Sequence, residues 1–383
     1  MNKSKIWLSS PHMGGNEQKY IQEALNSNWV APVGSNIDAF ELSLENYLGK
    51  GHITALHSGT AAIHLGLILL GVKTGDEVIC QSMTFSASVN PILYLGATPI
   101  FIDSEPDTWN LCPIALEEAI IDRISKGIIP KTIIAIALYG VPYKIEEIRT
   151  IADKYGIPIL EDSSEALGSS YRGQRCGTFG DVSVLSFNGS KIITTSGGGA
   201  IITASKELKQ RAIFLATQAK EDVSHYEHRE IGYNYRMSNI SAGIGRGQMN
   251  VLAKHIELRR MMHEFYLDLF KGFDGVAVYT VPDEDYFANY WLTTILINPK
   301  ETNGIMNETV RLKLLSENIE SRPLWKPMHR QPVFCKYPYY GKAYVADSLF
   351  ETGLCLPSGS KLSDVERARI KAVLTDLFTK HKK

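Results

Sequence analysis

The sequence predicts an α/β protein with a mostly parallel central sheet, followed by a smaller α+β unit. Short apolar strands alternate with helical segments over roughly the first two-thirds of the 383 residues. Several of these strands, such as Thr132 to Leu138, are apolar on both faces, which is typical of parallel strands covered by helices on both sides. With 44% hydrophobic residues, the chain can bury a large core in about two or three domain-sized units.

The alternation can be followed segment by segment. In chain order we expect a helix over Ala61 to Leu70, a strand over Glu77 to Cys80, a helix over about Ala87 to Leu95, a strand over Pro99 to Ile102, the strand Thr132 to Leu138, an amphipathic helix over Ile145 to Tyr155, and strands over Ile157 to Leu160, Val182 to Leu185 and Ala200 to Thr203.

The pattern changes in the second half of the chain. Long helical segments fill about Ser205 to Ala216 and Asn239 to Phe270. After Gly272 come strands Val276 to Val281 and Trp291 to Ile297, then helices near Glu308 to Asn318 and Leu362 to Thr379. We therefore expect a large domain over residues 1–254 and a small C-terminal α+β domain over residues 255–383.

Charge and composition exclude several classes of function. Forty basic residues face forty-one acidic ones, so the chain has no broad positive field for nucleic acid or a membrane surface. Its apolar runs reach at most about half of the ~20 residues that span a bilayer, and no signal peptide is visible, so we expect a cytoplasmic protein. The five cysteines are scattered, and neither they nor His225 and His228 complete a metal-binding pattern.

A glycine-rich helical segment resembles a dinucleotide-binding loop only superficially. In Gly243-Ile244-Gly245-Arg246-Gly247 the next residue is Gln248, and no strand precedes the motif. We interpret these small residues as a site of close helix packing, for which a dimer contact is one setting.

The first feature with chemical potential is Ser58-Gly59-Thr60-Ala61-Ala62, which leads into an apolar helix. A helix start offers unpaired N–H groups and positive dipole charge to a phosphate, and Gly59 lets the ligand come close. The structural alternative is a simple helix cap by Ser58 or Thr60, and the segment taken alone favours the cap.

Two further features follow apolar strands. Glu161 and Asp162 directly follow the strand Ile157 to Leu160. A carboxylate at this strand end can pair with a protonated ring nitrogen of a ligand, or it can merely order a loop. Ser186 and Lys191 follow the strand Val182 to Leu185. An amine at a strand end can form a Schiff base with an aldehyde, although most lysines are simply solvated.

Phe85 is the fourth feature, placed after the strand that ends at Cys80. Its ring can stack on a flat ligand or belong to the core. Together, an anion site, a flat ring, a carboxylate and an amine supply what pyridoxal phosphate (PLP) needs. The combination predicts a PLP enzyme, whereas each feature alone does not.

The sequence also resembles the sugar-nucleotide aminotransferases of the DegT/StrS type, which are fold-type I PLP enzymes. The resemblance covers essentially the whole chain and rests on six blocks: residues 10–17 (SPHMGGNE), 58–62 (SGTAA), 161–168 (EDSSEALG), 177–180 (GTFG), 232–239 (GYNYRMSN) and 322–329 (RPLWKPMH). Within the family the chain looks similar to enzymes that aminate C4 of UDP-4-keto-6-deoxy-N-acetylhexosamines.

The resemblance implies a role for each cofactor-binding residue. Lys191 holds the PLP aldehyde as a Schiff base, Asp162 contacts the ring nitrogen and Glu165 lies near the 3-hydroxyl. The PLP phosphate is expected to bind Ser58, Gly59, Thr60 and Ser186, with Asn234 contributed by a partner subunit. The active unit is then a homodimer with shared sites.

The resemblance also implies the substrates, L-glutamate and a UDP-keto-sugar. Arg236 and Arg322 are candidate cations for the diphosphate, with surface salt bridging as the alternative. Trp29, Trp325 and His329 are candidates for lining the sugar or base pocket, with core packing as the alternative.

Three other functions stay open at this point. One is amination at C3 of a dTDP-keto-sugar. Another is a related sugar 3-dehydratase, against which Lys191 argues, because relatives with that chemistry have histidine there. The third is a non-catalytic protein that senses PLP or a sugar nucleotide, against which the set Asp162, Ser186 and Lys191 argues.

Overall fold

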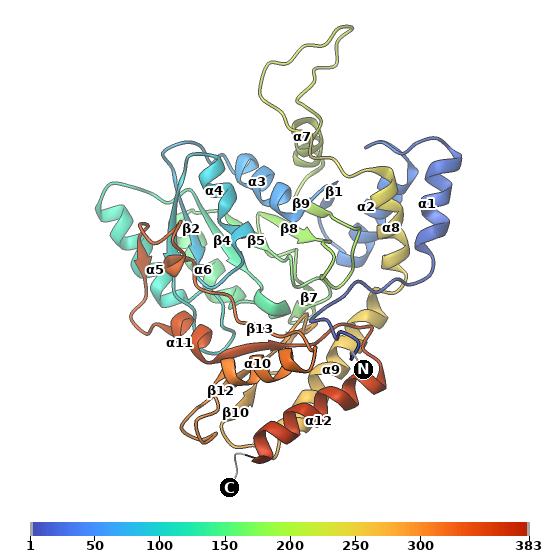
Figure 1. Cartoon of the computed structure of the whole chain (residues 1–383). Coiled ribbons are helices and arrows are strands. Elements are labelled where there is room, and N and C mark those ends of the chain that lie inside the picture. Colours follow the sequence, from blue (N-terminus) through green and yellow to red (C-terminus); the bar gives the residue numbers. More distant parts are fainter. Residues whose placement is uncertain (1–2, 381–383) are drawn as a thin grey trace.

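The computed structural model describes residues 3–380 and contains a large mixed sheet at its centre (Figure 1). Eight strands follow the order β1-β9-β8-β5-β4-β2-β3-β14. Only β9 runs antiparallel to its two neighbours, so the predicted α/β fold with a mostly parallel sheet is confirmed. The strands are β1 (His52–Leu56), β2 (Glu77–Gln81), β3 (Thr98–Ile102), β4 (Thr132–Ile136), β5 (Ile159–Asp162), β8 (Val182–Ser186), β9 (Gly199–Thr203) and β14 (Tyr339–Tyr340).

Helices cover both faces of this sheet because alternate strand residues are apolar on both sides. In β4, Ile133 and Ala135 pack in the core formed with α5 and α6, whereas Ile134 and Ile136 pack with α3, α4 and α7. The helices and helical turns of this part are α1 (Glu17–Asn26), α2 (Ser35–Leu48), α3 (Gly59–Leu69), η1 (Ser86–Ser88), α4 (Asn90–Tyr94), α5 (Pro113–Ser125), η2 (Leu138–Gly140), α6 (Ile145–Tyr155), α7 (Lys206–Ala216) and α8 (Asn239–Met249).

The C-terminal part has its own antiparallel sheet and core. The sheet has the order β10-β12-β15-β13, and Ile6 of the N-terminal segment joins its core. Its elements are α9 (Leu252–Phe270), β10 (Val276–Val278), β12 (Thr293–Ile297), α10 (Asn307–Ser316), β13 (Arg322–Pro323), η3 (Met328–Arg330), α11 (Val345–Thr352), β15 (Gly353–Leu356) and α12 (Asp364–Lys380).

Two short strands of the C-terminal part pair with strands of the rest of the molecule. β14 extends the large sheet next to β3. β11 (Tyr286–Phe287) forms a small sheet with β6 (Ser170–Tyr171) and β7 (Gln174–Arg175). The division at residue 254 stays a prediction, and that position lies in the first turn of α9.

Three predicted elements have different bounds in the structure. The helix expected over residues 87–95 is a short turn followed by α4, because Pro91 has no N–H to continue a helix from upstream. The strand expected to reach Leu138 ends at Ile136, and η2 follows with Tyr139 in the left-handed region (φ 53°). The helix expected over residues 239–270 is interrupted at Asn250 and Val251, between α8 and α9.

The interruption between α8 and α9 lets α8 lie flat against α1 and α2. A Cβ on Gly243 would come 3.1 Å from the Tyr20 backbone, one on Gly245 would come 2.7 Å from the Phe40 ring, and one on Gly247 would come 2.7 Å from Glu17 N. The glycine-rich segment is thus a site of close helix packing within the chain, as predicted.

The chain between α7 and α8 extends away from the body of the molecule (Figure 1). At its base, Gln218 N–H donates to Tyr233 O over 2.9 Å, and Thr217 bridges to Asn234. We call residues 218–234 the arm.

Among the helices of residues 3–380, none is long and apolar enough to cross a membrane.

Candidate active site

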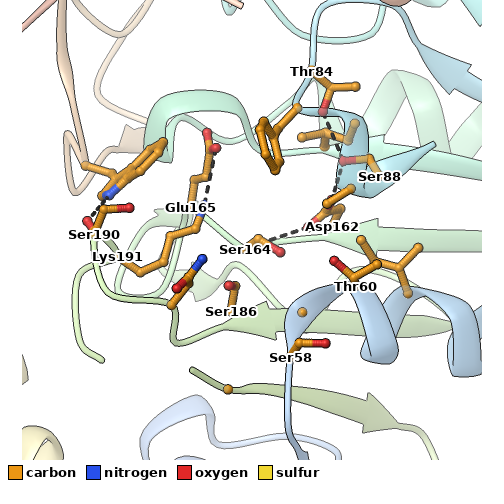
Figure 2. A pocket seen from close by; sticks show the side chains of 18 of the residues that line it. Ser58, Thr60, Thr84, Ser88, Asp162, Ser164, Glu165, Ser186, Ser190 and Lys191 are labelled. Atoms are coloured by element: carbon orange, nitrogen blue, oxygen red, sulfur yellow. Dashed lines mark hydrogen bonds and ion pairs between the residues drawn. The ribbon is translucent and has the colours of Figure 1, made fainter. Parts of the chain in front are cut away.

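A cavity of about 380 Å³ lies where β4, β5 and β8 end and α3 begins. This edge of an open parallel sheet is where ligands bind in α/β folds. The cavity brings together nine residues singled out from the sequence: Ser58, Gly59, Thr60, Phe85, Asp162, Glu165, Ser186, Lys191 and Trp325. Figure 2 shows Lys191 and Glu165 on one side of it, Asp162 and Ser88 on the other, and Ser58 and Ser186 below.

The start of α3 forms a cradle against the end of β8. Ser58 is the N-cap, and its Oγ accepts from Ala61 N over 3.1 Å, so the predicted helix cap is present. The N–H groups of Gly59 and Thr60 belong to the first turn, whose donors have no partner within the helix. A Cβ on Gly59 would lie 3.1 Å from Ser186 Oγ and 3.6 Å from Ser164 Oγ. N–H groups and hydroxyls therefore surround a space large enough for an anion only because residue 59 is glycine.

Asp162 is the last residue of β5 and is only 3% exposed. Its Oδ2 accepts from Ser88 Oγ over 2.7 Å, and its Oδ1 accepts from Ser164 N over 3.1 Å. Thr84 Oγ1 lies 3.0 Å from Ser88 Oγ and extends the chain of hydroxyls. The two donors stabilise the carboxylate and fix its orientation toward the cavity.

Glu165 and Lys191 form a buried pair on the opposite side. Glu165 Oε1 lies 3.4 Å from Lys191 Nζ, and Glu165 Oε2 accepts from Tyr139 N over 2.7 Å. The left-handed backbone of Tyr139 presents that N–H. Burial raises the pKa of Glu165 above its ordinary value, while the positive charge of Lys191 lowers it.

Aromatic rings border the amine and the mouth of the cavity. Lys191 Nζ lies 4.1 Å from the centre of the Trp291 ring, within cation–π range. Phe85 is 54% exposed and lies 5.4 Å from Trp325, centre to centre. Phe85 is therefore available to a ligand and is not a core residue.

Four of the predicted substrate-binding or cofactor-binding side chains are held elsewhere or exposed. Asn234 is exposed at the base of the arm, and Trp29 is exposed before α2. Arg236 donates to Glu41 Oε1 and, over 3.1 Å, to Ala55 O. Arg322 donates to Glu320 at the surface. None of the four is among the described residues that line the cavity, so their roles stay predictions.

His329 is a fifth predicted residue that is not among the described residues lining the cavity, and its role in substrate binding also stays a prediction. In the structure it joins two elements. Its Nδ1 lies 2.7 Å from Ser82 Oγ and its Nε2 lies 3.2 Å from Asp347 Oδ2. Burial lowers the pKa of this histidine, and Asp347 opposes that effect. The ring also stacks on Tyr339 at 3.9 Å, so within one chain His329 joins the loop after β2 to α11.

Sequence reasoning missed several residues of the site. Ser88 and Ser164 donate hydrogen bonds to Asp162. Ser88 lies close to Thr84 in the sequence and Ser164 lies close to Asp162, but this closeness only weakly indicates a role in the site. Trp291 is 100 residues from Lys191 in the chain, and only the tertiary fold places its ring at the amine. No sequence pattern pointed to it.

The donor set fits PLP. Lys191 supplies the one amine among the described lining residues, Asp162 a buried carboxylate for the ring nitrogen, and the Gly59 cradle a place for the phosphate. Within residues 3–380 no group of three or more His, Cys, Asp or Glu is arranged to hold a metal ion.

Comparisons with known proteins agree with this fit. The DegT/DnrJ/EryC1/StrS aminotransferase family matches residues 11–375. The chain is 48% identical over 380 residues to EpsN of Bacillus subtilis (strain 168), which carries the provisional name of a pyridoxal phosphate-dependent aminotransferase (98% of this chain, 96% of that protein). It is 36% identical over 374 residues to the GDP-perosamine synthase of Escherichia coli O157:H7 (98% and 99%).

A solved structure shows the same likeness in three dimensions. A DegT DnrJ EryC1 StrS aminotransferase from Brucella abortus superposes with a TM-score of 0.87 at 28% identity, over 96% of each chain. The chain therefore belongs to the DegT/DnrJ/EryC1/StrS family and is a PLP-dependent sugar-nucleotide aminotransferase.

Proposed function

We propose that this enzyme moves an amino group from L-glutamate to the C4 keto group of a UDP-4-keto-6-deoxy-N-acetylhexosamine. The observation that carries the chemistry is one cavity lined by Lys191 on one side and Asp162 on the other, with Ser58 and Ser186 below them (Figure 2). The sugar assignment is supported by the six sequence blocks that carry the resemblance.

Asp162, Lys191 and Glu165 would each have a separate role in this reaction. When bound, PLP supplies an aldehyde for amine exchange and a pyridinium that takes up electrons. Asp162, held by Ser88 and Ser164, would keep the ring nitrogen protonated. In the first half-reaction Lys191 Nζ would move a proton from Cα of the amino donor to C4′ of the cofactor, and in the second it would move a proton from C4′ to C4 of the sugar. Glu165, whose Oε1 lies 3.4 Å from Lys191 Nζ, would hold that nitrogen in position for both transfers.

The proposal includes a homodimer with shared sites. Asn234 is exposed at the base of an arm that reaches away from its own chain, and it does not line its own cavity (Figure 1). In a dimer, Asn234 would reach the phosphate cradle of the partner. Trp29 is exposed close to α2, where it would be available to the same assembly.

The test is the absorbance spectrum of the PLP-loaded enzyme. L-glutamate should shift the near-visible band of lysine-bound PLP to the shorter wavelength of pyridoxamine phosphate. A UDP-4-keto-6-deoxy-N-acetylhexosamine should reverse that shift, and the matched GDP- and dTDP-linked 4-keto sugars should reverse it more slowly.

Other outcomes decide between the alternatives. Reversal only by a 3-keto sugar would replace C4 amination with C3 amination. Faster reversal by the GDP-linked sugar would replace the nucleotide, which is the one in the name of the E. coli relative. Absence of any shift with glutamate or another amino donor would favour a sensor and refute the proposal.

A further inference from the structure

The carbonyl oxygen of Ser190, the residue before Lys191, accepts hydrogen bonds from three side chains. Ser9 Oγ of the N-terminal segment donates to it over 2.6 Å. Trp291 Nε1, just before β12, donates over 2.7 Å, and Arg259 Nη2 of α9 donates over 3.4 Å. A carbonyl accepts about two strong hydrogen bonds, so this oxygen is saturated.

Arg259 connects all of these partners. Its Nη2 also donates to Lys191 O over 3.3 Å and to Ser9 Oγ over 2.9 Å. Its Nη1 donates to Trp291 O over 2.6 Å and to Ser358 O over 3.4 Å. One guanidinium therefore holds the carbonyl groups of Ser190 and Lys191, which lie on either side of the Cα atom of Lys191. It also holds the carbonyl group of Trp291, whose ring contacts Lys191 Nζ.

The way in which Arg259 is buried is unusual for an arginine. The side chain is 1% exposed, and within residues 3–380 it forms no ion pair with a carboxylate. Burial alone lowers its pKa to about 9. A charge buried without a counterion is costly, and its hydrogen bonds all go to carbonyl and hydroxyl oxygens, those of Ser9, Ser190, Lys191, Trp291 and Ser358. A methionine or leucine would fill the same space without that cost.

We propose that Arg259 is a positioning residue for the reacting lysine: it acts through the backbone of Ser190 and Lys191, and together with Ser9 and Trp291 it sets where Lys191 Nζ lies. This inference goes beyond the substrate assignment, but it rests on the proposed role of Lys191. Reactions of this kind depend on placement, since a displacement of about 1 Å can cost about 10²-fold in rate.

The experiment compares Arg259→Met and Arg259→Lys with Arg260→Met as the matched control. Arg260 is the next residue of α9, donates to Ala288 O over 2.6 Å and covers the Phe287 ring, without contact to the lysine loop. The readouts are the Kd for pyridoxamine phosphate, which cannot form a Schiff base, by equilibrium dialysis; the fraction of bound PLP in the near-visible lysine-linked band; and kcat and KM for both substrates.

In Arg259→Met we expect the Kd for pyridoxamine phosphate to stay within about threefold, because the phosphate cradle contains no part of Arg259. The lysine-linked fraction should fall, and kcat should fall by about 10²-fold with KM changed much less. Arg259→Lys should recover part of both losses. Arg260→Met should behave like the unmodified enzyme. A normal lysine-linked fraction and kcat in Arg259→Met, or equal losses in Arg260→Met, would overturn the inference.

Two further variants cover the case in which Arg259→Met does not fold. Ser9→Ala and Trp291→Phe each remove one donor to Ser190 O, and each should lower kcat by about threefold to tenfold. Unchanged values in both variants and in Arg259→Lys would refute the positioning role. Lys191→Ala is measured in parallel: if it keeps the near-visible band, the proposed role of Lys191 fails, independently of Arg259.

Discussion

Replacing Gly59 with alanine tests the phosphate cradle. The added Cβ would lie 3.0 Å from Ser186 Cβ and 3.1 Å from Ser186 Oγ. The backbone at residue 59 has no room to retreat, because Gly199 of β9 packs directly behind it: a Cβ on Gly199 would lie 2.5 Å from Gly59 N. The methyl group must therefore displace Ser186 or occupy the space of the phosphate.

The magnitude follows from the contacts at risk. A hydrogen bond to a charged group contributes about 1.5–3 kcal/mol, so losing one or two of them should cost about 3 kcal/mol of binding. That cost corresponds to an increase of about 100-fold in the Kd for PLP. Without PLP the effect should be small, because the crowding of Ser186 is offset by the better helix propensity of alanine, about 1 kcal/mol.

The assay is equilibrium binding of PLP, together with denaturant unfolding of the PLP-free protein. Gly197→Ala is the matched control: Gly197 lines the same cavity, but its Cβ would come no closer than 3.9 Å to another atom, His57 O. A Kd for Gly59→Ala within threefold of the unmodified protein would show that the phosphate does not lie against residue 59.

Three other substitutions test separate parts of the account. Ser88→Ala removes one of the two donors to Asp162 and should lower kcat by about 10-fold, whereas Ser86→Ala on the same turn should leave it unchanged; equal rates for the two would contradict the role of Ser88. Burial holds the pKa of His255 at about 4, below the 6.5 of the unfolded chain, so its contribution to stability is complete above pH 6.5 and is lost as the pH falls toward 4. His12 stacks on this ring, and Arg259 and Glu17 also act on it. In PLP-free protein, His255→Gln should therefore reduce the loss of unfolding free energy between pH 7 and pH 4 by about 2 kcal/mol after allowance for solvent screening, and an unchanged pH dependence would refute this. Gly140→Ala should cost about 3 kcal/mol or more in denaturant unfolding, since Gly140 has φ 88° and its Cβ would lie 1.9 Å from Asn289 Oδ1; Gly156→Ala, also at positive φ but with open space around it, should cost about 1 kcal/mol.

Much of the fold and the site could be predicted from the chain because both depend on local patterns. Strands apolar on both faces fix the parallel sheet, and strand ends fix the positions of Asp162 and Ser186. Lys191 follows one strand end by five residues, so its proximity to Asp162 follows from β5 and β8 being neighbours. The family blocks then assigned chemistry to these positions.

The contacts that were not predicted join residues that lie far apart in the chain, and local sequence patterns do not encode such contacts. Trp291 and Arg259 approach Lys191 from the C-terminal part, and Ser9 approaches from the N-terminal segment. Arg236 looked like an anion-binding cation in sequence, yet the fold places Glu41 beside it. Whether Arg236 also binds the diphosphate stays a prediction.

A chemical label identifies which lysine holds PLP. The loaded enzyme is reduced with borohydride, which makes the link between lysine and cofactor permanent, and the labelled peptide is identified by mass spectrometry. We expect one labelled residue, Lys191, and no label in Lys191→Ala. A label on another lysine, or a fully labelled Lys191→Ala protein, would contradict the assignment of the active site.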